Sequence, residues 1–253
     1  MRKYNINKKM FDVNNDICIG INKNYKKNNN TILYLPDSIS VIKKEAFVWS
    51  DLEKVIIPNS VKVIEDSAFI ENNLEKLIIP DSVKEIGEFA FAYNLLKEVI
   101  ILDSIDFIGE CAFIGNKLKK LILPNSVKKI GRSAFSYNKL EKVIIPNSIK
   151  EIDQEAFRNN QLTEITMPNS VTKIGRKAFA YNELKKIVIP DSVEIIGREA
   201  FYDNQLEEVV IPDSVKIIES KAFHRNDLKS IKISKNTEFD DSIVDLDVNI
   251  IRY

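Results

Sequence analysis

The chain contains only two cysteines and one histidine among its 253 residues. Cys18 and Cys111 lie far apart, so they give neither a disulfide framework nor a metal-ligand spacing. His224 is the only imidazole available for acid–base chemistry. Phosphate-binding loops, zinc-protease motifs and nucleophile elbows are also missing. We therefore expect no enzyme activity, no metal site and no cofactor.

An excess of charge of either sign is also missing, because 37 Lys and Arg balance 37 Asp and Glu. Such a chain has no basic field to hold nucleic acid or an anionic membrane. No apolar run approaches 18 residues, and the basic start at 1–9 is not followed by an apolar run of seven or more. We expect no nucleic-acid partner, no membrane insertion and no export signal, which makes the cytoplasm the default location.

Proline is scarce but strictly periodic. All eight prolines fall on one series with a spacing of 22 residues, and the only empty place in that series is Leu102. A fixed period of this length is typical of a solenoid, in which each repeat packs only on its neighbours. The members of the series are Pro36, Pro58, Pro80, Pro124, Pro146, Pro168, Pro190 and Pro212.

One rung shows how the repeat folds. Leu77 and Ile79 alternate as in a short strand, which ends at Pro80 because proline cannot continue a hydrogen-bonded ladder. Stacked rungs then form a parallel sheet. The pair Ala90-Phe91 recurs nine times at this spacing and predicts a short helical or 3₁₀ turn on the opposite side.

Two further columns of the repeat carry structural expectations. Gly87 and its equivalents predict a backbone conformation that is costly for other residues. Asn94 and its equivalents precede each strand, where their amides can satisfy buried backbone groups as an asparagine ladder.

The ends of the array need capping structures, because an uncovered terminal rung exposes apolar side chains and unpaired backbone hydrogen-bonding groups of its strand. We expect an Asn/Lys-rich segment with a degenerate capping repeat over 1–30, a nine-rung solenoid over 31–233, and an acidic cap over 234–253. Within the last segment, the alternation over 243–250 predicts a closing strand.

The repeated pattern I-x-I-P-x-S-V-x-x-I-G-x-x-A-F resembles the BspA-type, or Treponema-type, leucine-rich repeat over 31–233. In that family a Cys usually stands where this chain has Asn, in a repeat of 23 residues. The resemblance implies a non-enzymatic solenoid that binds proteins, often in secreted or surface-exposed adhesins that contact host matrix or other cells.

Three surface columns are candidates for binding. The outward place of each strand forms an apolar stripe, which strand propensity alone also favours. Beside it runs a charged row, which either engages a partner or keeps the sheet soluble. Aromatic residues occupy alternate rungs of a third column, where they either grip an extended ligand or pack over the turn. The candidate partner-binding face comprises Ile56, Ile78, Ile100, Ile122, Ile144, Lys76, Lys120 and Lys142, and the aromatic row comprises Trp49, Tyr93, Tyr137 and Tyr181.

These features predict a monomeric protein–protein interaction module built as a leucine-rich repeat scaffold, and the family resemblance implies an adhesin-like or host-interacting character. Two alternatives stay open: a structural or self-assembling rod, and a glycan-binding protein that uses the aromatic row.

Overall fold

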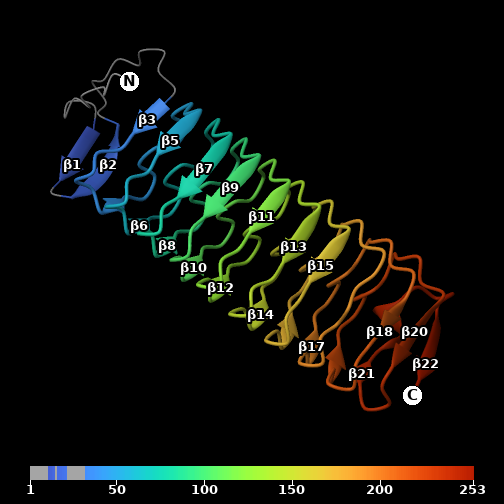
Figure 1. The fold of residues 1–253 in the computed structure, drawn as a ribbon. Coiled ribbons are helices and arrows are strands. Elements are labelled where there is room, and N and C mark those ends of the chain that lie inside the picture. Colours follow the sequence, from blue (N-terminus) through green and yellow to red (C-terminus); the bar gives the residue numbers. More distant parts are fainter. Residues whose placement is uncertain (1–10, 15, 22–31) are drawn as a thin grey trace.

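The computed structural model describes residues 11–14, 16–21 and 32–253. This part of the chain winds through about ten turns into one elongated body. Strand β1 (Phe11–Asn14) lies at one end and β22 (Asn249–Arg252) at the other (Figure 1). Within the regular rungs, paired strands are parallel and in register at an offset of 22 residues, as in Lys76 opposite Glu98. The predicted solenoid and its period are confirmed.

The first row of strands carries the L-x-x-[IV]-x-I segment of each rung. Within a strand, side chains alternate between interior and solvent, as in β7, where Leu77 and Ile79 are buried and Ile78 is exposed. Pro80 follows the last residue of β7, as expected. The strands of this row are β3 (Ile32–Tyr34), β5 (Lys54–Ile56), β7 (Lys76–Ile79), β9 (Glu98–Ile101), β11 (Lys120–Ile122), β13 (Lys142–Ile144), β15 (Glu164–Thr166), β18 (Val209–Val210), β20 (Ser230–Ile233) and β22.

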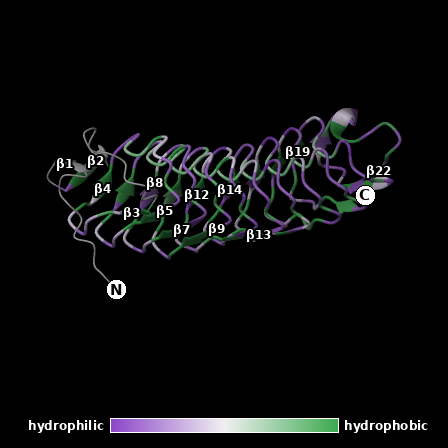
Figure 2. Ribbon diagram, turned by 90° about the horizontal axis from the view of Figure 1, so that it is seen from above, coloured by the Kyte–Doolittle hydropathy of each residue, from purple (hydrophilic) through white to green (hydrophobic). Residues whose placement is uncertain are grey.

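A second row of two-residue strands follows the proline corner. Its strands pair in parallel from rung to rung, so each turn contributes to two sheets. Hydrophobic and hydrophilic residues alternate around the turns along the whole body (Figure 2). The strands are β4 (Val41–Ile42), β6 (Val63–Ile64), β8 (Glu85–Ile86), β10 (Phe107–Ile108), β12 (Lys129–Ile130), β14 (Glu151–Ile152), β16 (Lys173–Ile174), β17 (Ile195–Ile196), β19 (Ile217–Ile218) and β21 (Glu238–Phe239).

The Ala–Phe segments form hydrogen-bonded turns rather than regular helix. Ser67 and Glu71, which flank Ala68-Phe69, have φ values of 53° and 54°, in the left-handed region that a right-handed helix cannot include. The Phe69 N–H donates to the Ala90 carbonyl of the next rung at 2.8 Å. The backbone is therefore used to join rungs. In the described residues the only 3₁₀ helix is η1 (Asp241–Ile243).

A column of phenylalanines forms the centre of the core. The nine Phe side chains from Phe47 to Phe223 are fully buried. Neighbouring rings stack with centroids 5.0–5.7 Å apart and interplanar angles of 1–13°. Because each ring stacks on the rings of the neighbouring rungs, the core is continuous while every rung depends on its neighbours.

The predicted asparagine ladder is present. Asn94 Oδ1 accepts the Leu74 N–H at 3.2 Å, and its Nδ2 donates to the Phe69 carbonyl at 2.9 Å and the Phe91 carbonyl at 3.2 Å. One amide thus joins two rungs and satisfies backbone groups that are out of reach of water. Equivalent bonds recur from Asn72 to Asn226.

The repeated glycines have a different role from the expected one. Gly87 and Gly109 do not have positive φ values. A Cβ on Gly87 would lie 2.6 Å from the Asp66 nitrogen, and one on Gly109 would lie 2.5 Å from the Gly87 carbonyl carbon. Glycine is therefore used here because successive rungs approach closely, and not to permit an unusual backbone conformation.

The two ends of the stack differ. At the N-terminal end, β1 pairs antiparallel with β2 (Ile17–Ile21), which pairs in parallel with β4. The rest of the expected N-terminal segment, 1–10, 15 and 22–30, lies outside the described residues. At the C-terminal end, the strand expected over 243–250 begins at Asn249 and pairs with β20, while Ile243 belongs to η1.

Candidate binding surfaces

The apolar stripe is the column of outward side chains on the first row of strands. Parallel register places Ile78 opposite Ile100 and aligns this column from rung to rung. The five isoleucines lie on one face of the body with exposed fractions of 40–78%. Beyond Thr166 the stripe resumes with Val188 and Val210, at 80% and 50% exposure. The side chains are Ile56, Ile78, Ile100, Ile122 and Ile144.

The charged row flanks the stripe. Lys76 Nζ lies 3.6 Å from Glu98, and Lys142 Nζ lies 2.6 Å from Glu164. Both pairs are about half exposed or more, so each contributes little to stability. Lys120 forms no ion pair with any residue that the structure describes. The three ammonium groups can therefore pair with carboxylates of a partner at small cost.

The aromatic row separates into an open part and a covered part. Trp49, Tyr93 and Tyr137 are 70%, 50% and 48% exposed. Tyr181 is half-buried, because the Arg158 guanidinium lies 5.2 Å from its ring centroid and a further tyrosine packs against its edge. Arg158 also lies 5.6 Å from the Tyr137 centroid, so it fills the space between these two rings.

The sequence-based search did not identify Arg158 or Tyr202 as members of this cluster. The Tyr202 ring meets Tyr181 edge-on at 5.5 Å and stacks on His224 at 5.9 Å. Both residues occupy a column whose side chains range from alanine to arginine. Their role depends on contacts with the neighbouring aromatic column, and such contacts are missed when each column of the repeat is considered by itself. The covered part of the row therefore begins where large side chains occupy both columns.

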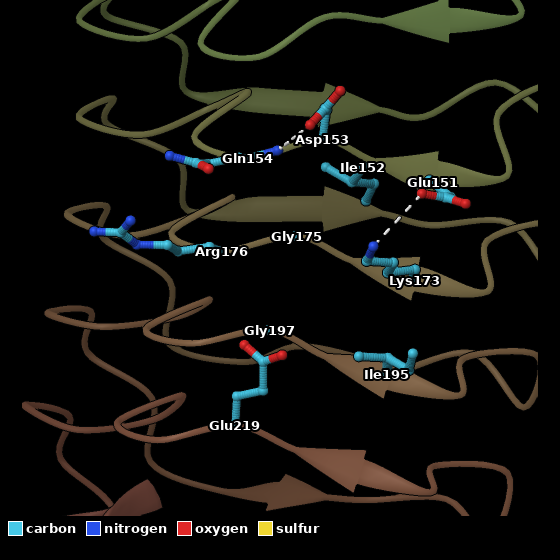
Figure 3. Close-up of a pocket in the computed structure, with 10 residues that line it drawn as sticks. All are labelled: Glu151, Ile152, Asp153, Gln154, Lys173, Gly175, Arg176, Ile195, Gly197 and Glu219. Atoms are coloured by element: carbon cyan, nitrogen blue, oxygen red, sulfur yellow. Dashed lines mark hydrogen bonds and ion pairs between the residues drawn. The ribbon is translucent and has the colours of Figure 1, made fainter.

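A hollow of about 270 Å³ lies over the second row of strands (Figure 3). Its carboxylates are already engaged: Glu151 lies 3.9 Å from Lys173, while Asp153 and Glu219 each accept a backbone N–H at 2.7 Å. These groups stabilise the local backbone, and the hollow presents no pair of carboxylates arranged for acid–base chemistry. Gly175 and Gly197 also line it.

The most enclosed carboxylate belongs to Glu199, which is 8% exposed. Burial acts to raise the pKa of Glu199, but the hydrogen bonds and charges of Lys177 and Arg198, both at 3.0 Å, outweigh it and hold the pKa below its usual value. The group is therefore charged at neutral pH and joins adjacent rungs. The lowered pKa of Glu199 therefore has a structural cause.

Neither cysteine forms a disulfide. Burial, together with the negative charge of Glu110, raises the pKa of the Cys111 thiol, which makes it a poor nucleophile at neutral pH. His224 Nδ1 lies 3.1 Å from the Asp245 carboxylate, within the C-terminal end of the stack. In the described part of the chain, no three His, Cys, Asp or Glu residues are grouped to hold a metal ion.

Within the described ranges, no helix is long and apolar enough to cross a bilayer. What the structure presents is a rigid repeat body with long, regular surface columns. These features define a leucine-rich repeat solenoid of the scaffold class. A model of the BspA type leucine rich repeat region matches residues 19–141 and 128–245, with six copies. The chain belongs to this family, whose members are repeat scaffolds that generally take part in protein interactions.

Solved structures with this fold come from several bacteria. A leucine-rich cell surface protein from Faecalibacterium prausnitzii is 22% identical, with a TM-score of 0.50 over 87% of this chain and 78% of its own. The pneumococcal vaccine antigen PcpA is 23% identical, with a TM-score of 0.54 over 88% and 79%. A leucine-rich repeat protein from Eubacterium ventriosum is 22% identical, with a TM-score of 0.52 over 83% and 66%. No curated protein matches the chain.

Proposed function

We propose that this protein is a non-catalytic scaffold that captures another protein on the apolar stripe and its flanking lysines. The observation that carries the proposal is the run of five adjacent isoleucines, 40–78% exposed, on one sheet face. A contiguous exposed apolar patch on a folded protein is a feature of interaction sites. Because the strands are held by the stack, binding requires little ordering of this surface.

The charged row suggests the chemistry of the partner at the rim of the interface. Lys76, Lys120 and Lys142 project beside the isoleucines from alternate and adjacent strands. A partner with an aliphatic or aromatic centre and carboxylates at its edge would complement this arrangement. The stripe would then supply most of the affinity, while the lysines would set orientation and the rate of association.

The relatives are consistent with a role in contacts between the cell and its surroundings. One is described as a cell surface protein and another as a vaccine antigen. We propose the same adhesin-like setting for this chain, acting as a monomer.

The test is a comparison of captured partners between matched variants. Ile78→Lys, Ile100→Lys and Ile122→Lys together place three charges in the stripe while leaving the buried columns unchanged. A control variant, Gln161→Lys, Thr172→Lys and Gln205→Lys, adds the same charge at exposed positions outside the stripe. Circular dichroism establishes that both variants fold.

Under this proposal, the wild type and the control capture the same partner and the stripe variant does not. Retention of the partner by the stripe variant would contradict the proposal. A change in sedimentation of the stripe variant alone, with no heterologous partner captured, would instead assign the stripe to self-association.

A further inference from the structure

The open part of the aromatic row has a regular spacing that the protein-binding proposal does not use. Trp49, Tyr93 and Tyr137 each lie two residues after a phenylalanine of the core column. Core rings from Phe47 to Phe135 are 5.0–5.5 Å apart per rung, so side chains two rungs apart are about 10–11 Å apart. The three rings therefore mark a repeat of about 10 Å over a length of about 20 Å.

The backbone at this column disfavours aromatic residues. Trp49, Tyr93 and Tyr137 have φ values of 50°, 54° and 55°, and the equivalent Gly115 and Asn159 have 69° and 54°. Glycine and asparagine adopt the left-handed region readily, whereas bulky residues there are outliers. Every rung has this conformation at this column, with Glu71 and Asp203 as well as Gly115 and Asn159 between the rings, so the turn itself does not require a large ring at any of these positions.

The rungs between the rings provide space and hydrogen-bonding groups. A Cβ on Gly115 would lie 2.5 Å from Tyr93 Cδ1, so only glycine lets this ring cover the next rung. Glu71 accepts the Trp49 Nε1–H through one carboxylate oxygen, and its other oxygen accepts no hydrogen bond from the residues that the structure describes. Together with the exposed amide of Asn73, Glu71 borders a shallow hollow of about 450 Å³ beside Tyr93.

We infer that the row from Trp49 to Tyr137 is a binding site for an extended, neutral β-1,4-linked glycan chain. Successive pyranose rings in such a chain are flipped relative to each other, so every second ring presents the same face. That two-sugar repeat is close to the two-rung repeat of the aromatic row. The apolar C–H face of a sugar packs on an aromatic ring, and its hydroxyl groups bond to side chains such as Glu71 and Asn73.

The charges and the limits of the row fit this ligand class. Glu71 is the only charged residue of the aromatic column between Trp49 and Tyr137, and its carboxylate would repel an anionic polymer. Beyond Tyr137 the surface is closed, because Arg158 fills the space up to Tyr181. The open site is therefore long enough for about four or five sugar rings. It does not depend on the apolar stripe.

The chain provides its own reporter, because Trp49 is its single tryptophan. The probes are cellohexaose and chitohexaose, which are β-1,4-linked, and maltohexaose, which is α-1,4-linked and curves away from a straight row. Titration of the full chain should give a saturable change in tryptophan fluorescence with a β-linked probe and none with maltohexaose. The response to each β-linked probe distinguishes a glucose polymer from an N-acetylglucosamine polymer as the source.

The decisive variant is the double substitution Tyr93→Asn and Tyr137→Asn. Asparagine suits the left-handed backbone, so the rings are removed without strain and Trp49 remains as the reporter. We expect affinity to fall at least tenfold. The matched control is Tyr181→Asn, in the same column and conformation but in the covered part of the row, and it should bind as the wild type does.

Failure of this inference is separable from failure of the protein-binding proposal. The stripe variant Ile78→Lys, Ile100→Lys and Ile122→Lys should bind the glycan normally. No saturable response to either β-linked probe at millimolar concentration would overturn the inference. An equal response to maltohexaose, or unchanged affinity in a folded Tyr93→Asn and Tyr137→Asn variant, would overturn it as well.

Discussion

The asparagine ladder can be tested at its centre with Asn138→Ala. Asn138 is 7% exposed, and its Oδ1 accepts the Leu118 N–H at 3.1 Å. Its Nδ2 donates to the carbonyls of Phe113, Phe135 and Ser136 at 2.9–3.2 Å. Alanine removes all of these bonds at once.

The expected loss of stability depends on which backbone groups keep a hydrogen-bond partner in the Asn138→Ala variant. The Phe113 and Phe135 carbonyls still accept the amides of Asn116 and Asn160, and the Ser136 carbonyl still accepts a backbone N–H. The buried Leu118 N–H has no other partner among the described residues. An unsatisfied buried donor costs about 1–3 kcal/mol, and the weakened carbonyl bonds add to it, so we expect a loss of about 2–3 kcal/mol in the free energy of unfolding.

Urea unfolding followed by circular dichroism measures this loss, with the exposed neighbour change Lys139→Ala as the control. In a stack where each rung depends on its neighbours, a central defect weakens two interfaces, whereas Asn226→Ala near the C-terminal end should cost less. If Asn138→Ala lowers the free energy of unfolding by less than about 0.5 kcal/mol, as little as Lys139→Ala does, the asparagine ladder does not satisfy buried backbone groups as we infer.

Two further substitutions test the contacts between rungs. Gly109→Ala should lower the free energy of unfolding by about 2 kcal/mol or more, because its Cβ would meet backbone atoms of the preceding rung at 2.5–2.7 Å. The same urea assay measures this loss. A neutral or stabilising result would show that the rungs can move apart to accommodate the added methyl group. For Glu199 the pKa is lowered in the folded state, so its contribution to stability is present above the unfolded value of about 4.3 and is lost as the pH falls through the lower folded value. The stability difference between the wild type and Glu199→Gln should therefore be largest at neutral pH and shrink below about pH 4, and a difference that does not change with pH would exclude the proposed ion pairs.

The columns that face the interior could be predicted from the sequence because each has one chemical requirement. Leu77, Ile79 and Phe91 recur as apolar residues at a fixed spacing, and a buried place tolerates little else. Asn94 was predictable for a related reason, since a polar residue that recurs among apolar ones needs backbone partners. Periodicity alone therefore gave the solenoid, the first sheet and the ladder.

The details that could not be predicted depend on distances between rungs. A repeated glycine such as Gly87 can indicate either a positive φ or a close approach between rungs, and the sequence does not distinguish these two causes. The 2.6 Å contact in the structure identifies the close approach. The left-handed backbone conformation lies instead at Ser67 and Glu71, whose residue types do not predict a positive φ. The second sheet has strands of two residues, such as Glu85–Ile86, which are too short to show an alternation.

The two candidate surfaces differ in how much the repeat itself explains. The apolar stripe occupies a strand position where β-branched residues are favoured in any case, so its composition has a structural cause as well as a functional one. The aromatic row occupies a turn position where the backbone favours glycine and asparagine, and the exposed rings there work against that preference. A residue type that opposes its local conformation needs a further stabilising contact or a function. For Tyr181 the contact is visible, since Arg158 covers the ring. Trp49 Nε1–H bonds to Glu71 and the Tyr93 ring lies over Gly115, yet half or more of the surface of each residue is in solvent, and a bound glycan would cover that surface.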